Sequence, residues 1–148
     1  MLKRGAIPEA DEGGIAMTDR ELVERAFEMH RYSYVPYSRF PVGAALLCAD
    51  GTVFTGCNVE NAAYGSTICA ERTALLKAVS EGHRTDWQAI AIAGRGEDFC
   101  WPCGSCRQML YEFAPGLRVL AARGDGQFQC VPLRELLPHG FGPASLKK

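Results

Sequence analysis

Three cysteines and one glutamate lie in two short segments with the composition of a metal site. Cys69-Ala70-Glu71 begins one predicted helix, and Cys103 and Cys106 lie at the start of a second helix. Unpaired N–H groups and the helix dipole at such positions favour thiolates over thiols, which is the state that a metal needs. Cys103 and Cys106 are three residues apart, so both can face the same side of the first turn. Three thiolates predict tetrahedral zinc with its fourth position open to water.

The residues that follow the cysteines suggest how the charge of such a site is balanced. Zinc with three thiolates carries a formal charge of −1, which opposes lowering the pKa of bound water. Arg72 and Arg107 each follow a cysteine, and a guanidinium that donates to sulfur withdraws negative charge. Arg72 is the stronger candidate for this role. Arg107 is the second candidate, and its alternative is to pair with a backbone carbonyl or an acid. Glu71 cannot share the direction of Cys69, so we predict that it meets the bound water as general acid and base.

The order of these residues is typical of zinc deaminases, in which His or Cys, then x-Glu, precedes Pro-Cys-x-x-Cys. In that chemistry activated water attacks the ring carbon that bears an amino group, and the glutamate moves protons until ammonia leaves. Two alternatives stay open. An iron–sulfur cluster would take Cys69 or Cys130 as its fourth ligand, and a structural zinc would take a fourth thiolate such as Cys100.

Apolar periodicity and turn residues predict the elements that position these groups. Thr18 and Glu21 have the spacing of a capping box, and the helix that they begin is expected to run to about Tyr34. Asp50-Gly51 predicts a tight hairpin. The remaining expected elements are helices over 68–79, 102–113 and 133–137 and strands over 42–49, 52–59, 87–94, 117–123 and 127–131. This alternation predicts one layered α/β domain over residues 17–148, after a leader, residues 1–16, that we expect to be disordered.

Composition and charge exclude several classes of protein. The chain has 148 residues with 16 basic and 17 acidic side chains, and no block of like charge, which argues against nucleic-acid binding. No apolar run approaches the roughly 20 residues of a membrane span, and the first residues do not resemble a secretory signal, so we expect an intracellular protein. The cysteines in or beside the expected strands are expected to be small buried apolar residues; they are Cys48, Cys57 and Cys130. The histidines are expected to be ordinary surface or structural residues; they are His30, His83 and His139.

Five separate segments resemble the small homotetrameric cytidine deaminases. They are YVPYSRFPVGAAL, the Asp-Gly pair, GCNVENAAYGSTICAERTALLKAVSEG, PCGSCRQMLYEF and ELLPHGFGP, and the resemblance runs from about residue 18 to 146. It implies a three-layer α/β/α fold with a central mixed five-stranded sheet. It also implies one Zn²⁺ per subunit held by Cys69, Cys103 and Cys106, with Glu71 as proton shuttle.

The same resemblance implies the substrate contacts. Asn58 and Glu60 match positions that hold the ribose hydroxyls, and Phe40 matches an aromatic at the pyrimidine. Backbone groups around Ala70 are expected to recognise the base. Phe141 matches an aromatic that reaches the site of a neighbouring subunit, which implies a homotetramer with shared active sites.

The polar character of these residues favours a neutral nucleoside as substrate. The segment NVEN supplies an amide and an acid, and no cationic cluster is present to bind a phosphate. We therefore expect deamination of cytidine and 2′-deoxycytidine in pyrimidine salvage, in the cytoplasm. The alternative substrates are a modified cytosine nucleoside such as blasticidin S, and a nucleotide. Trp101 and Cys100 depart from the family pattern, and a bulky Trp101 beside the site would narrow substrate choice or pack elsewhere.

Overall fold

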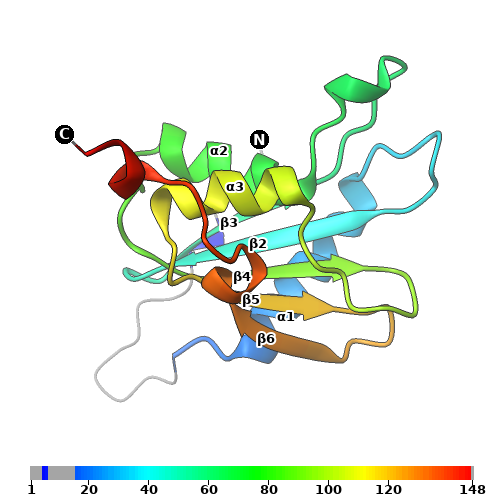
Figure 1. The fold of residues 1–148 in the computed structure, drawn as a ribbon. Coiled ribbons are helices and arrows are strands. Elements are labelled where there is room, and N and C mark those ends of the chain that lie inside the picture. The colour runs from blue at the N-terminus through cyan, green and yellow to red at the C-terminus, as the bar shows by residue number, and fades with distance from the viewer. Residues whose placement is uncertain (1–4, 7–15, 148) are drawn as a thin grey trace.

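A computed structural model describes residues 5–6 and 16–147, in which one sheet lies between two layers of helices (Figure 1). The helices are α1 (Asp19–Glu28), α2 (Ala70–Ser80), α3 (Gly104–Phe113) and α4 (Leu133–Leu136), with 3₁₀ turns at Met29–Tyr32, Tyr64–Ser66 and Pro143–Leu146. The strands are β1 (Gly5–Ala6), β2 (Val42–Cys48), β3 (Thr52–Cys57), β4 (Trp87–Gly94), β5 (Arg118–Ala122) and β6 (Phe128–Pro132). None of the described helices is long and apolar enough to cross a membrane.

The sheet has the order β1-β3-β2-β4-β5-β6 and is mixed, because β4 and β5 are parallel while the other neighbours are antiparallel. Strands β2 to β6 are the five expected from the sequence, so the predicted mixed sheet is confirmed. The two-residue strand β1 adds to its edge by pairing with Val53 and Thr52 of β3. Gly5–Ala6 lies inside the expected leader, and the other residues of that leader, apart from Ala16, lie outside the described residues.

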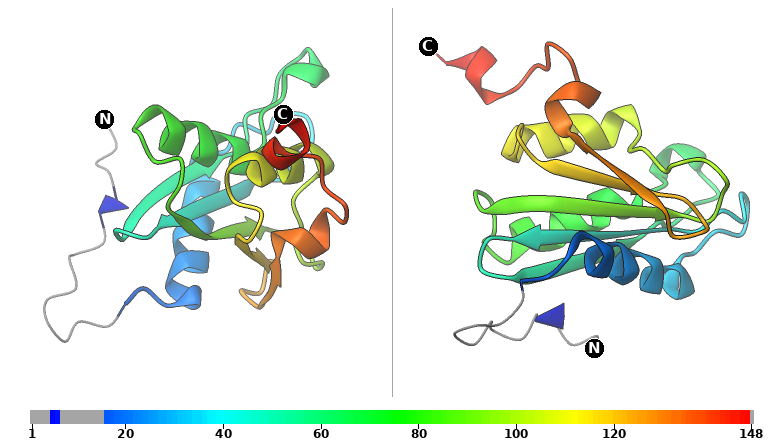
Figure 2. Two further views of the ribbon diagram at one scale, coloured as in Figure 1. Left: turned by 60° about the vertical axis from the view of Figure 1, so that its left-hand side comes forward. Right: turned by 90° about the horizontal axis from the view of Figure 1, so that it is seen from below.

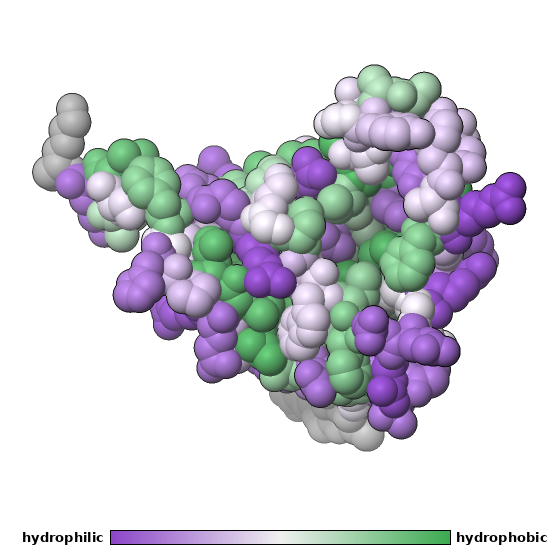
Figure 3. Space-filling view, turned by 45° about the vertical axis from the view of Figure 1, so that its right-hand side comes forward, coloured by the Kyte–Doolittle hydropathy of each residue, from purple (hydrophilic) through white to green (hydrophobic). Residues whose placement is uncertain are grey.

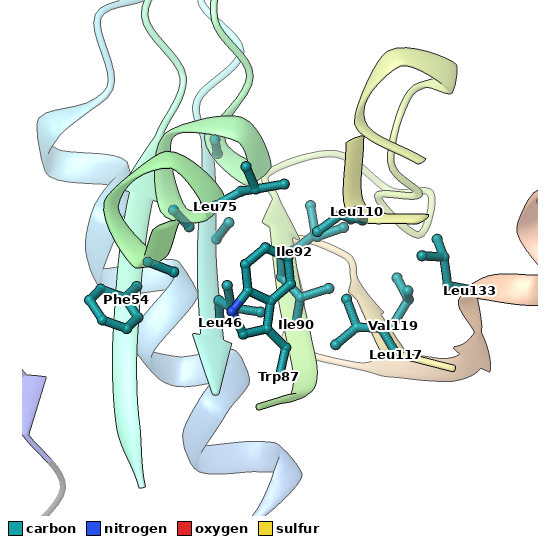
Figure 4. Close-up of a cluster of buried hydrophobic side chains, with 14 of the residues drawn as sticks. Leu46, Phe54, Leu75, Trp87, Ile90, Ile92, Leu110, Leu117, Val119 and Leu133 are labelled. Atoms are coloured by element: carbon teal, nitrogen blue, oxygen red, sulfur yellow. The ribbon is translucent and has the colours of Figure 1, made fainter. Parts of the chain in front are cut away.

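Helices cover both faces of the sheet, as the predicted α/β/α layering requires (Figure 2). Helix α1 packs on one face, where Leu22, Val23 and Ala26 meet small residues of β2 and β4. Helices α2 and α3 lie on the other face, and Leu75 and Leu110 point from them into the main core (Figure 4). The predicted metal ligands, which lie at the starts of α2 and α3, therefore belong to this second face.

Local signals in the sequence account for these boundaries. The Thr18 hydroxyl accepts from the backbone N–H of Glu21, and the Glu21 carboxylate accepts from that of Thr18, so the predicted capping box is confirmed. Gly51 adopts φ 86° in the predicted hairpin turn. The first helix ends earlier than predicted, because its last turn tightens into the 3₁₀ segment Met29–Tyr32.

Candidate active site

The N-termini of α2 and α3 lie side by side above the sheet, and they bring the three motif cysteines together (Figure 1). Cys69 is the N-cap residue of α2 and Cys103 that of α3, and neither side chain caps its own helix. The two Sγ atoms are 3.8 Å apart, and all three sulfurs, with that of Cys106, lie within 4.8 Å of one another. Three sulfurs bound to zinc at about 2.3 Å in a tetrahedron are roughly 3.8 Å apart, so this donor set fits zinc.

Neighbouring donors favour the ionised form of the Cys69 sulfur. The Cys106 thiol and the Arg72 guanidinium both donate to it, and they lower the pKa of Cys69 to about 5 against the opposing effect of its burial. The Arg72 Nη2 atom lies 3.4 Å from this sulfur and 3.3 Å from the carbonyl oxygen of Thr67. Arg72 thus occupies the position from which a guanidinium withdraws charge from a thiolate ligand.

Arg107 does not have the role that its sequence position suggested. Its Nε donates to the carbonyl oxygen of Pro102 at 2.7 Å, and its Nη1 donates to that of Leu136 at 2.8 Å. The side chain ties the first turn of α3 to the end of α4, which is the alternative left open for it. The expectation that Arg107 compensates sulfur charge is therefore not supported, because the guanidinium is turned toward carbonyl groups instead.

Glu71 lies in the first turn of α2 and forms part of the wall of a cavity of about 190 Å³. The cavity is also lined by Cys69, Cys103, Ala70, Asn58, Thr67, Val42, Cys100 and Trp101. Only 5% of Glu71 is exposed, and this burial raises the pKa of its carboxyl group to about 7, with the nearby Cys69 adding to the shift. A buried carboxyl group beside the sulfurs, with a pKa near neutrality, has the properties of a proton carrier.

Asn58, which lines this cavity, and Glu60 both bond to backbone groups of the segment before β2. The Asn58 amide accepts from the N–H of Val42 at 3.0 Å and donates to the carbonyl oxygen of Phe40 at 2.9 Å. One carboxylate oxygen of Glu60 accepts from the N–H groups of Tyr37 and Ser38, at 3.0 and 3.1 Å. The bonds from Ser38, through its hydroxyl group and its N–H, and from the Tyr37 N–H lower the pKa of Glu60, so it presents a carboxylate.

Glu60 also lines a second hollow, which adjoins the first. This hollow, of about 300 Å³, is bounded by Tyr37, Ser38, Glu60, Tyr64 and Thr67. Thr67 lines both cavities, and it was not singled out from the sequence because it matches no motif position with a known chemical role. Thr67 thus lies between the hollow that Glu60 lines and the cavity that Cys69 and Cys103 line.

The remaining predicted substrate residues lie in different places. Ala70 is buried at the start of α2 and lines the cavity. The Phe40 ring lies against the β4 end, where a Cβ on Gly94 would come within 3.3 Å of it, and it does not line the cavity itself. Phe141 is 59% exposed on the C-terminal segment, where its carbonyl oxygen accepts from Gln108.

The positions of Cys100 and Cys130 bear on the two alternative metal sites. Cys100 lines the cavity and lies beside Gly94, but it does not belong to the group of three sulfurs. Cys130 is exposed on strand β6, also outside that group. Neither residue is arranged as a fourth thiolate ligand, so the described geometry favours an open site with three sulfurs.

Comparisons with known proteins identify the family and its metal. Residues 16–122 match the family model described as the cytidine and deoxycytidylate deaminase zinc-binding region. The chain belongs to this family. Zinc is accordingly the metal of the deaminase domain, and the family is that of hydrolases acting on carbon–nitrogen bonds.

Individual members of the deaminase family resemble the chain over most of its length. The cytidine deaminase of Sporosarcina psychrophila is 44% identical over 131 residues, which cover 88% of this chain and 96% of that protein. The cytidine deaminase of Halalkalibacterium halodurans is 49% identical over 125 residues, or 83% of this chain and 94% of that one. The crystal structure of cytidine deaminase from Burkholderia pseudomallei superimposes with a TM-score of 0.82 at 45% identity, and covers 84% of this chain and all of that one.

Proposed function

We propose that this deaminase converts cytidine and 2′-deoxycytidine to the uracil nucleosides with release of ammonia. The observation that carries the proposal is a single cavity whose wall contains two thiol sulfurs of the metal group and a buried glutamate. Relatives at 44–49% identity that are named cytidine deaminases support the choice of substrate. A hydrolytic deaminase needs water activated beside a group that both accepts and returns a proton, and these residues meet that need.

In this proposal the side chains of the cavity divide the reaction between them. Cys69, Cys103 and Cys106 hold zinc, which supplies a Lewis acid that lowers the pKa of water. Glu71 would take one proton from that water at its carboxylate and pass it to the ring nitrogen. It would then take the proton of the hydroxyl group added to the ring carbon and pass it to the amino group, which leaves as ammonia. Arg72 draws charge from the Cys69 sulfur. Its hydrogen bond to the Thr67 carbonyl also holds the start of α2 against the cavity.

The hollow beyond Thr67 is proposed to take the sugar. Glu60, in that hollow, and Asn58, in the first cavity, are proposed to offer a carboxylate and an amide to the ribose hydroxyls. Phe40, whose ring lies against Gly94 at the end of β4, is proposed to offer an aromatic face to the pyrimidine. A 5′-phosphate would meet the negative charge of Glu60, and none of the residues that line the two hollows is Lys or Arg. This charge pattern favours the nucleoside over the nucleotide.

The proposal is tested by ammonia release from the zinc-loaded protein with cytidine, 2′-deoxycytidine, cytidine 5′-monophosphate and blasticidin S in parallel. We expect kcat/KM to be highest for the two unmodified nucleosides. Glu71→Gln is the matched control, because it preserves shape and zinc while removing the proton carrier, and it should lower kcat by ~10²–10⁴-fold or more. Turnover of the nucleotide or of blasticidin S above that of both nucleosides would replace the proposed substrate.

We further propose that the active unit is a homotetramer whose subunits share active sites. Support comes from aromatic side chains that are exposed in the single chain. Tyr64 is 74% exposed on the projecting segment around residues 60–67, which overhangs the surface in Figure 3. Tyr37 packs edge-on against it at 5.6 Å, and Phe141 lies on the C-terminal segment. Burial of such aromatic surface between subunits is a common basis of stable association.

Phe141→Ala tests the sharing of sites separately from the assembly. If the aromatic ring completes a neighbour's site, KM for cytidine rises while the mass measured by light scattering stays that of the tetramer. Unchanged kinetics in an intact tetramer would contradict the shared site. Light scattering of the unmodified protein decides the tetramer itself.

We also propose a cytoplasmic role in pyrimidine salvage. All seven cysteines are free, which suits a reducing compartment, and the proposed products are the uracil nucleosides that a salvage reaction yields.

A further inference from the structure

A second group of metal-ligand side chains lies at the opposite end of the sheet from the three sulfurs. Within residues 5–6 and 16–147, two groups of three such side chains have ligand atoms within 4.8 Å of one another, and the second consists of Cys48, His83 and Asp86. Cys48 ends strand β2, whereas Val42, which begins that strand, lines the active cavity. Cys48 is six positions after Val42 along the strand, a distance of roughly 20 Å. This cluster is therefore distinct from the active site.

The backbone fixes the positions of these three side chains. Gly82 adopts φ 91°, which ends α2, and the N–H of His83 bonds back to the carbonyl oxygen of Ala78 at 2.9 Å. The turn that follows joins the hairpin turn of β2 and β3, because the N–H of Ala49 donates to the carbonyl oxygen of Asp86 at 2.7 Å. Cys48 from the hairpin and His83 and Asp86 from the helix turn are thus brought together by main-chain bonds.

The imidazole ring of His83 is oriented on several sides. Its Nδ1 lies 2.8 Å from an Asp86 carboxylate oxygen, and its Nε2 lies 3.8 Å from an Asp50 carboxylate oxygen. Phe54 packs edge-on against the ring at 5.1 Å, and the Trp87 indole donates to the His83 carbonyl oxygen. A ring held in this way is preorganised as a ligand, and the Asp50 carboxylate lies on the Nε2 side of the ring.

One oxygen of the cluster has no partner to account for its burial. The second carboxylate oxygen of Asp86, Oδ1, is buried without a hydrogen bond from any of the described residues, although the first oxygen contacts His83. A buried acceptor without a hydrogen bond destabilises the folded chain. A charge pair between His83 and Asp86 would explain one oxygen, but it explains neither Oδ1 nor a buried thiol beside it. A cation bound by all three groups explains both.

We propose that Cys48, His83 and Asp86 form a second site for a divalent transition-metal ion, with zinc as the preferred ion. Thiolate and imidazole ligands select zinc or cobalt over magnesium and calcium, which prefer oxygen alone. On binding, the Cys48 thiol releases its proton to solvent, His83 coordinates through Nδ1, and the ring proton resides on Nε2 facing Asp50. One thiolate and one carboxylate balance the charge of the ion. The ion joins the β2–β3 hairpin to the turn between α2 and β4.

The test is the number of zinc ions bound per chain at equilibrium, measured by mass spectrometry of the full-length protein after dialysis against buffered Zn²⁺. We expect two equivalents in the unmodified protein and one in Cys48→Ser, while Cys130→Ser, which changes an exposed cysteine on β6, keeps two. The equivalent at the three sulfurs reports in the same sample that α2 and α3 are folded. Should Cys48→Ser fail to fold, His83→Gln serves in its place with the same expected loss.

Cobalt supplies an independent reading of the ligands. The second equivalent of Co²⁺ should add a thiolate-to-cobalt charge-transfer band, and that band should be missing from Cys48→Ser and His83→Gln. One equivalent of metal in the unmodified protein would overturn the proposal. Two equivalents that persist in both variants would also overturn it, because the second ion would then be bound elsewhere.

Discussion

Replacing Gly56 with alanine should push helix α2 away from the sheet and displace Cys69 from the sulfurs of Cys103 and Cys106. Gly56 lies on β3 directly beneath the first turns of α2. A Cβ there would overlap the carbonyl oxygen of Ala70 and lie 2.6 Å from the backbone nitrogen of Ala74, whereas ordinary contact begins at 3.4 Å. Both are backbone atoms, so the helix itself must move, by about 0.8 Å to restore that second contact.

The size of the effect follows from two opposing contributions. Overpacking of this kind costs ~1–3 kcal/mol, while alanine gains about 0.5–1 kcal/mol over glycine in a strand, so the clash prevails. A net loss of about 1–2 kcal/mol lowers Tm by roughly 2–8 °C for a chain of this size. Metal–ligand distances vary by only about 0.2 Å, so a shift of Cys69 by several times that amount should weaken zinc binding. A similar displacement of Glu71 should lower kcat by up to ~10²-fold.

Gly43→Ala is the matched control, because Gly43 makes the same kind of contact on the other face of the sheet. A Cβ there would overlap the carbonyl oxygen of Ala26 in α1, which holds no proposed ligand. Calorimetry, zinc affinity and kcat are measured for both variants. We expect both to lose stability and Gly56→Ala alone to lose zinc affinity and rate out of proportion. Unchanged zinc affinity in folded Gly56→Ala, or an equal loss in Gly43→Ala, would refute the reasoning.

Two further predictions concern charge at the site. Arg72→Gln should weaken zinc binding by ~10–100-fold in a competition titration, because it removes a donor to the Cys69 sulfur. Arg107→Gln should lower Tm with little change in zinc affinity, because the partners of Arg107 are carbonyl oxygens. Equal effects of the two variants on zinc would contradict this distinction. Glu60→Gln should raise KM for cytidine. It should also lower the ratio of kcat/KM for cytidine to kcat/KM for cytidine 5′-monophosphate, because the amide no longer repels the phosphate. Steady-state kinetics with both substrates measure this ratio, and an unchanged ratio would place Glu60 away from the 5′ position.

The elements and the three-sulfur cluster were predictable because their causes are local in the sequence. The Asp50-Gly51 turn and the capping box at Thr18 each depend on residues within four positions of one another. The cysteines depend on a motif that places them at helix N-termini, where the structure has them. The layered fold follows from the alternation of these elements.

Contacts between distant segments were not predictable in the same way. Arg107 bonds to the carbonyl oxygen of Leu136, 29 residues away, and no pattern in the sequence signals a carbonyl group as partner. Cys48 and His83 each had an ordinary interpretation when taken alone, as a buried apolar residue and a structural histidine. Their proximity arises only when the ends of two turns are joined by the bond from Ala49 to Asp86.

The contacts of Asn58 determine how its substitution has to be interpreted. Its amide bonds to the backbone at both Phe40 and Val42, so it holds Phe40 and one wall of the cavity in place as well as lining the cavity itself. Asn58→Ala would break two hydrogen bonds from the side chain to the backbone, of ~0.5–1.5 kcal/mol each, and displace Phe40, in addition to any sugar contact that it removes. Its effect on KM should therefore be similar for cytosine nucleosides that lack individual ribose hydroxyls. If the rise in KM instead disappears with a nucleoside that lacks one hydroxyl group, Asn58 contacts that hydroxyl group, and the displaced backbone at Phe40 and Val42 contributes little.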